Sequence, residues 1–198
     1  MLALRYSPAS PYARKVRVAA DILGLTDRVK ISTVDTADPN DPIRAQNPLG
    51  KIPTLLMEHG FALYDSRVIA EYLDHLAGGG ALFPADPARR FLALRLQALG
   101  DGICDAALLL RYEETTRPEE ARSASWTELQ KGKIDRAIAA LEAAPPAGPT
   151  DIGHVAVACA LGYLDLRFAG AWRAQAPKLV AWLEAFEKVT PAFAATKA

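Results

Sequence analysis

The residues Asn47-Pro-Leu-Gly-Lys-Ile-Pro-Thr-Leu-Leu56, followed by Tyr64-Asp-Ser66, decide the fold of this chain. Pro53 stands directly before residues 54–57, which we expect to be a strand. Proline has no N–H for a sheet ladder, so it belongs at the start of a strand, and an X-Pro bond in a tight turn can be cis. A cis bond here would leave the backbone of Ile52 unpaired and able to bond the backbone of a peptide ligand.

Asp65 and Ser66 stand where a helix would start. The free N–H groups and the positive dipole end of a helix start suit a carboxylate. The alternative is that both residues only cap the helix. Beside Pro53 they predict a site for a small peptide. The expected helix has an apolar face of Val68, Ile69, Tyr72, Leu73 and Leu76.

The first 77 residues alternate strand and helix patterns. Residues 2–6 and 29–34 are predicted strands, and an apolar repeat of helical spacing between them ends at Gly24. Residues 54–57 and 62–64 are predicted to form a hairpin around Glu58-His-Gly60. We therefore expect the order β-α-β-α-β-β-α, which is an α/β pattern with one parallel crossover.

The composition changes at residues 78–87, where glycines and Asp86-Pro87 predict a linker. We expect one domain over residues 1–77 and an all-helical bundle domain over residues 88–198. Its first helix is predicted to run to about Thr116. The nearly continuous apolar stretch 152–168 is predicted to be its core helix.

Composition excludes several classes of function. The chain has 23 basic and 23 acidic residues, which argues against a nucleic-acid partner. Its two cysteines and three histidines do not form a metal-ligand pattern, so we expect no metal. No apolar run approaches the roughly 20 residues of a membrane helix, and the first residues become polar too soon for a signal peptide. We expect a cytoplasmic protein without a membrane partner.

Three motifs, Ser10-Pro11, the run 47–55 and Tyr64-Asp65-Ser66, resemble those of the glutathione transferase family in its bacterial, serine-type form. The resemblance covers the whole chain in length and order of elements. It implies a thioredoxin-like first domain and a helical second domain. It also implies glutathione as co-substrate, an electrophilic small molecule as partner, a role in detoxification, and a homodimer. Phe83, Phe91, Leu92 and Leu94 are apolar residues near the linker that could pair two copies or join the two domains.

Ser10 is the main catalytic candidate. As Ser-Pro it can simply cap a helix, with proline at the first helical position. The resemblance makes it the serine that hydrogen-bonds the glutathione thiolate, helped by the helix dipole. Ser7 and Tyr6 are the alternatives. No cysteine precedes position 104, so disulfide exchange in the first domain is not expected.

The resemblance also assigns the glutathione contacts. Ser66 and its N–H would hold the γ-glutamyl carboxylate, and Asp65 would position the amino group. Ile52, before Pro53, would exchange backbone hydrogen bonds with the cysteinyl part. Lys51 would approach the glycyl carboxylate or remain solvated.

The helical domain is expected to supply the electrophile pocket. Two arginines in that pocket would suit an acidic or carbonyl-bearing electrophile, although each could instead form a surface ion pair. Asp101 is a candidate to reach the ligand's amino group across a dimer interface. The candidate pocket residues are Tyr6, Ile103, Ala107, Arg111, Tyr112, Tyr163 and Arg167.

Two further features read as structural. Asp151 can cap the core helix, and His154 stands where the family usually has an acid, so the reciprocal bond of a capping box is not expected. Cys104 and Cys159 lie in apolar helices and read as core residues.

Other functions compete with conjugation. The fold could serve as an interaction module, with or without bound glutathione, because fold does not determine function. A further hypothesis is that the protein is a glutathione-dependent isomerase or dehalogenase. Residues 100–170 do not specify the co-substrate.

Overall fold

The computed structural model describes residues 1–58 and 60–198, so His59 in the predicted hairpin lies outside the described residues. The first domain contains a four-stranded sheet of order β2-β1-β3-β4, in which β1 and β2 are parallel and the other pairs are antiparallel. Its elements are β1 (Leu2–Tyr6), α1 (Pro11–Ile22), a 3₁₀ turn (Thr26–Arg28), β2 (Val29–Thr33), α2 (Ile43–Gln46), β3 (Thr54–Leu56), β4 (Ala62–Leu63) and α3 (Ser66–Leu76). The predicted α/β order is confirmed.

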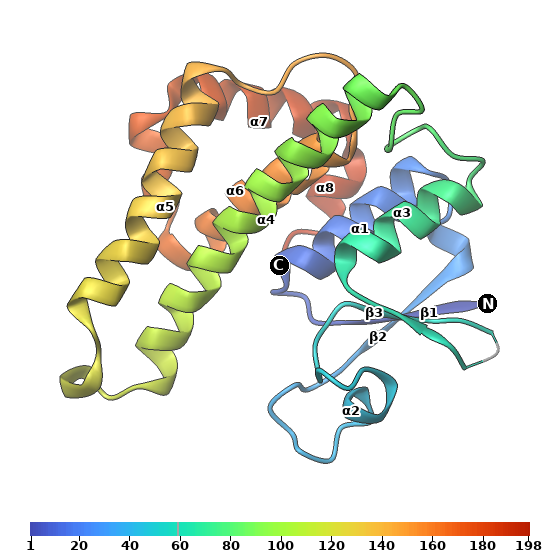
Figure 1. Ribbon diagram of the computed structural model, residues 1–198, viewed down its shortest axis with the longest axis horizontal. Helices are drawn as coiled ribbons and strands as arrows, with labels where there is room; N and C mark the ends of the chain where they lie inside the picture. Colours follow the sequence, from blue (N-terminus) through green and yellow to red (C-terminus); the bar gives the residue numbers. More distant parts are fainter. Residues whose placement is uncertain (59) are drawn as a thin grey trace.

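Helices α1 and α3 lie side by side on the face of the sheet that is turned toward the helical domain (Figure 1). Their apolar sides cover Leu4 of β1 and Leu55 of β3, both of which are fully buried. Val16 of α1 and Ile69 of α3 complete this core. The periodicity that predicted the two helices is therefore the periodicity of one buried interface.

The second domain is all helical, as predicted (Figure 1). Helix α6 (Ile152–Phe168) is its core element and has the predicted bounds. It packs against α4 along much of its length and also against α1 of the first domain. The other elements are α4 (Pro87–Thr116), α5 (Ala124–Ala143), α7 (Pro177–Val189), α8 (Pro191–Ala195) and 3₁₀ turns at Glu119–Ala121 and Ala171–Gln175.

The start of α6 differs from expectation. His154 does complete a capping box, because its Nδ1 accepts from the Asp151 N–H over 3.4 Å while Asp151 Oδ1 accepts from the His154 N–H over 3.2 Å. An imidazole nitrogen can thus take the place of the usual acid. Helix α7 ends at Val189, and Pro191 begins α8, where a missing N–H is harmless.

Helices α4 and α6 approach each other closely at two glycines of the described chain. A Cβ on Gly100 would lie 2.7 Å from the Ala156 carbonyl carbon, and one on Gly153 would lie 2.7 Å from the Ala93 oxygen. Only glycine leaves room for two backbones at this separation. No helix in the described part of the chain is long and apolar enough to cross a membrane.

Candidate active site

The register of the sheet brings three separate segments together at one end of its strands. Tyr6, at the end of β1, lies opposite Thr33 in the parallel strand β2. Because β3 runs antiparallel to β1, with Thr54 opposite Arg5, the start of β3 lies at this same end of the sheet. Because β4 runs antiparallel to β3, its end lies there too. The residues after β1, before β3 and after β4 are therefore neighbours.

Ser10 is the residue that links β1 to α1. Its Oγ accepts a hydrogen bond from the Ala13 N–H over 3.2 Å, so it is the N-cap of α1, with Pro11 at the first helical position. A hydroxyl has one donor hydrogen and two acceptor lone pairs. Capping uses one lone pair and leaves the hydrogen free for a ligand. The positive end of α1 adds to the attraction for a negative ligand atom.

The segment before β3 presents its backbone. The Ile52–Pro53 peptide bond is cis, and neither backbone group of Ile52 forms a hydrogen bond within the described residues. The turn is held by Asn47, whose buried side-chain amide donates to the Lys51 carbonyl over 3.0 Å and to Thr54 Oγ1 over 3.1 Å. The Lys51 side chain is exposed. This geometry leaves a peptide edge open at the position that the sequence predicted.

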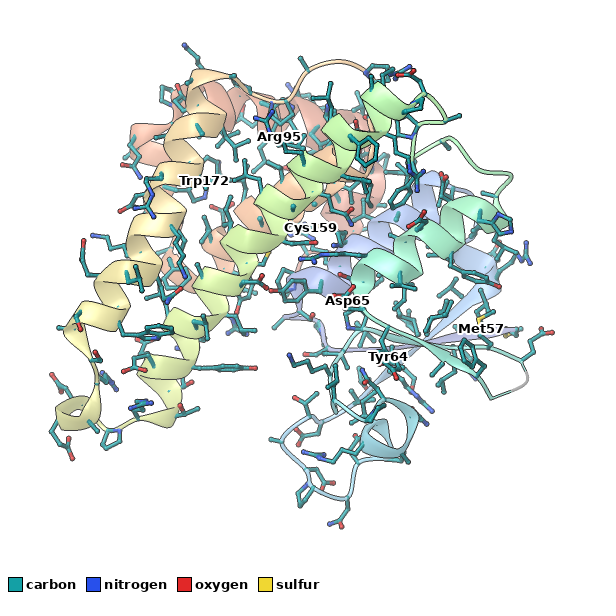
Figure 2. All side chains as sticks on the ribbon, in the orientation of Figure 1. Met57, Tyr64, Asp65, Arg95, Cys159 and Trp172 are labelled. Atoms are coloured by element: carbon teal, nitrogen blue, oxygen red, sulfur yellow. The ribbon has the colours of Figure 1, made fainter. Side chains whose placement is uncertain are left out.

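Asp65 and Ser66 form the start of α3. Figure 2 shows Tyr64 and Asp65 where the chain leaves β4 and enters that helix. Asp65 Oδ1 accepts from the Arg67 N–H over 2.9 Å, which makes Asp65 the N-cap, and the Tyr64–Asp65 bond is cis. Ser66 is almost fully buried, and its hydroxyl has no hydrogen-bond partner among the described residues. The hydroxyl and the first amides of α3 form a compact group of donors.

Asp101 does not have the role that was expected of it. It is buried in α4, where Oδ1 lies 2.6 Å from Lys15 Nζ and Oδ2 lies 2.9 Å from Arg67 Nε. A carboxylate committed to two cations of its own chain is not free to reach a ligand across a dimer interface. It instead joins α1 and α3 to the helical domain.

A pocket of about 270 Å³ opens beside Ser10, between α1, α6 and the C-terminal segment. Its walls include Ser10, Arg14, Tyr163 and Phe193. This volume lies just below the usual range for ligand sites, which begins at about 300 Å³. The start of α1 thus adjoins both the open backbone of Ile52 and a second space, which is open to solvent on one side.

Family models of known proteins match both domains of the chain. The family model described as "Glutathione S-transferase, N-terminal domain" matches residues 4–81, and that described as "Glutathione S-transferase, C-terminal domain" matches residues 124–185. The chain belongs to the glutathione S-transferase family.

Relatives of this glutathione S-transferase family member span nearly its whole length. It is 33% identical over 184 residues to the "Uncharacterized GST-like protein YibF" of Escherichia coli, covering 90% of each chain. It is 43% identical to a glutathione transferase family member from Pseudomonas fluorescens Pf-5 solved with bound glutathione. That match has a TM-score of 0.93 and covers 100% of this chain and 98% of the other. A second structure from Pseudomonas fluorescens Pf-5, with bound S-(propanoic acid)-glutathione, matches at 43% identity and a TM-score of 0.90, covering 100% and 99%.

The predicted electrophile residues are not all brought together. Tyr163 lines the pocket beside Ser10. Ile103 and Ala107 are buried in the helical core, and Tyr6 packs against the core of the first domain, so none of the three lines this pocket. Their apolar character reflects packing between elements.

The two predicted arginines and Tyr112 also lie outside this pocket. Arg111 Nη1 lies 2.8 Å from Glu114 Oε2 in an ion pair near the surface, which is the structural alternative considered for it. Tyr112 is exposed. The Arg167 guanidinium lies 5.8 Å from the ring centre of Tyr163 and does not itself line the pocket.

Arg14, which no sequence pattern singled out, lines the pocket although only 8% of its surface is exposed. Burial lowers the pKa of its guanidinium. A signal for it existed, because Arg14 lies four residues after Ser10 and therefore one helical turn away on the same side of α1. The apolar repeat of α1 hid that signal.

Both cysteines are core residues, as predicted. Cys104 and Cys159 are buried, and Cys159 lies within α6 behind α4 in the view of Figure 2. Burial raises the pKa of the Cys159 thiol to about 12, so it stays protonated at neutral pH. Among residues 1–58 and 60–198 there is no cluster of three or more metal-ligating side chains.

Proposed function

We propose that this protein is a glutathione transferase that conjugates glutathione to an electrophilic small molecule. One observation carries the proposal. At one end of the sheet, the free hydroxyl hydrogen of Ser10 adjoins the unpaired backbone groups of Ile52 and the donors at the start of α3. A small pocket opens beside Ser10. These parts suit a peptide thiol and a second substrate.

Ser10 is proposed to stabilise the sulfur of glutathione as a thiolate. Its Oγ–H donates to the sulfur while its lone pair keeps the cap bond to Ala13. This bond and the dipole of α1 favour the charged form and lower the thiol pKa from its free value of about 8.5. The thiolate then attacks an electrophilic carbon, forming a C–S bond as the electron pair moves onto a leaving group or an adjacent carbonyl.

The remaining contacts orient the tripeptide. Ser66 and the first amides of α3 are proposed to bind the γ-glutamyl carboxylate, and the exposed Asp65 carboxylate the amino group. Ile52 is proposed to exchange backbone hydrogen bonds with the cysteinyl residue, and Lys51 to approach the glycyl carboxylate. The Pseudomonas fluorescens relatives, whose structures hold glutathione and an S-substituted glutathione, support this reading.

We also propose that the protein forms a homodimer. Phe91 and Leu92 at the start of α4 are 70% and 61% exposed, and Val68 on α3 is 46% exposed. Phe83 and Leu94, which the sequence grouped with them, instead pack in the helical core. Sedimentation of the wild type and of Phe91→Lys tests this, because a charge in the interface would shift the protein toward monomers.

The first experiment is a titration of purified protein with glutathione, recording the ultraviolet absorbance of the thiolate across the neutral pH range. A bound thiol that ionises well below the free value supports the proposal. Conjugation assays with a panel of electrophiles would then test turnover and separate conjugation from isomerase or dehalogenase activity. Absence of both a thiolate signal and heat of binding would favour an interaction module.

A further inference from the structure

Arg14 is a buried cation whose position is held by the C-terminal segment. Its Nη2 donates to the Phe193 carbonyl over 2.5 Å, and its Nε donates to Thr196 Oγ1 over 3.3 Å. The Phe193 ring centre lies 3.8 Å from the guanidinium carbon. On the other side a Cβ on Gly162 would lie 2.4 Å from Nη1, so α6 leaves room for the group only because residue 162 is glycine. The guanidinium is therefore fixed rather than mobile.

Within the described residues no carboxylate forms an ion pair with Arg14. A buried charge without a counter-charge is unfavourable, and proteins normally pair it. A guanidinium has five N–H donors, of which the two bonds above use two. Donors on Nη1 and Nη2 thus remain in a group that lines the pocket beside Ser10.

Glu187 and Asp165 lie near enough to act on Arg14 through space, but neither forms an ion pair with it. The Asp165 carboxylate is committed to Arg173, with an Nη2–Oδ2 distance of 2.7 Å, and it also accepts from the Trp172 indole over 2.9 Å. Glu187 and Lys197, which line the pocket as well, offset each other in charge. Arg14 is therefore the buried cation of this pocket that has no ion-pair partner among the described residues, and the positive end of α1 adds to the attraction for an anion.

We propose that Arg14 binds an anionic group of the electrophilic substrate, so that the preferred co-substrates are small electrophiles carrying a carboxylate. A guanidinium fork matches a carboxylate in geometry and charge. Since Ser10 and Arg14 lie one helical turn apart, the carboxylate and the reacting carbon would be separated by only a few bonds. Arg14 is thus a specificity-determining residue, and its assignment rests on the proposed function.

The test compares two ligands of the same shape by calorimetry: glutathione whose sulfur carries a propanoic acid group, and the corresponding propanamide. In the wild type the acid is expected to bind about tenfold tighter or more, which is the scale of one charged hydrogen-bonded pair. In Arg14→Gln the two ligands should bind equally. The ratio of the two affinities isolates the charge effect, because a general loosening of the fold weakens both ligands alike.

Two matched variants accompany Arg14→Gln. Thr196→Ala removes one anchor of the guanidinium but keeps its charge, so the preference for the acid should persist. Glu187→Gln removes a negative charge from the pocket, so the preference should rise about threefold by loss of repulsion through partly solvated space. If Arg14→Gln does not fold, the test rests on Glu187→Gln. An unchanged ratio of the affinities for the acid and the amide in that variant contradicts the proposal.

The outcomes distinguish failure of the anion site at Arg14 from failure of the proposed function. If the wild type binds acid and amide equally, Arg14 is not an anion site, although binding of both ligands would still support the proposed function. If neither ligand nor glutathione itself binds, the proposed function fails and the specificity assignment fails with it. A preference for the acid that survives in a folded Arg14→Gln protein would also overturn the assignment.

Discussion

Lys15 Nζ lies 2.6 Å from Asp101 Oδ1 and 2.9 Å from Oδ2, and both side chains are almost completely buried. The pair joins α1 of the first domain to α4 of the second. Arg67, an exposed side chain of α3, contacts the same carboxylate. Two helices that position the site are thereby tied to the helical domain by a single acidic residue.

Replacing Lys15 by methionine is expected to lower the free energy of unfolding by about 3 kcal/mol, because it leaves Asp101 buried with only its exposed partner. Denaturant titration measures this. The control is Arg111→Met, which breaks a pair near the surface and should change stability by less than about 1 kcal/mol. Equal effects of the two substitutions would mean that the buried pair has no special weight.

Ser10→Ala is expected to lower kcat roughly 100-fold, the scale for losing one preorganised donor to a developing or stabilised anion. Glutathione binding should weaken far less. The pKa of the bound thiol should rise toward its free value, so the thiolate fraction at neutral pH should fall. Steady-state kinetics and thiolate absorbance measure the two effects.

The matched control for Ser10 is Ser123, which caps α5 through a 3.3 Å bond from the Trp126 N–H to its Oγ. Ser123→Ala should cost a similar amount of stability, about 1 kcal/mol, with unchanged kcat. Wild-type turnover in Ser10→Ala would remove Ser10 from the mechanism and turn attention to Ser7 and Tyr6.

Asp65→Ala is expected to raise the Kd for glutathione roughly tenfold or more, because a charged hydrogen bond to the ligand's amino group is lost. Isothermal calorimetry measures Kd. Asp86 is a matched control, since it caps α4 by accepting from the Arg89 N–H over 2.9 Å. If Asp86→Ala weakened glutathione binding as much as Asp65→Ala, the effect would be one of helix capping and not of ligand contact.

Gly100→Ala is expected to destabilise the protein by about 2 kcal/mol or more, because its Cβ would meet the backbone of α6 at 2.7 Å. Gly102→Ala, two residues further along α4, has nothing within 4 Å and should stabilise by roughly 0.5–1 kcal/mol through helix propensity. Thermal unfolding of both variants measures the contrast. Shifts of the same sign would show that the close approach of α4 and α6 does not govern the first.

The elements of the first domain could be predicted because each depends on nearby residues. Pro53 stands directly before β3, which begins at Thr54, and Ser10 and Asp65 cap the helices that follow β1 and β4. The lining of the pocket beside Ser10 was harder to predict. Ile103 and Ala107 have the apolar character of a pocket wall and of a core, and sequence periodicity does not distinguish the two.

The sequence by itself determined the family, the order of strands and helices, and the bounds of the core helix α6, since caps, prolines and apolar periodicity act over a few residues. Only the tertiary structure decided which charged side chains are buried and what they face. Asp101 became an anchor between domains, and Arg14 became a fixed cation in the pocket beside Ser10. Both outcomes depend on contacts between residues 86 or more positions apart, from Lys15 to Asp101 and from Arg14 to Phe193, which no local pattern encodes.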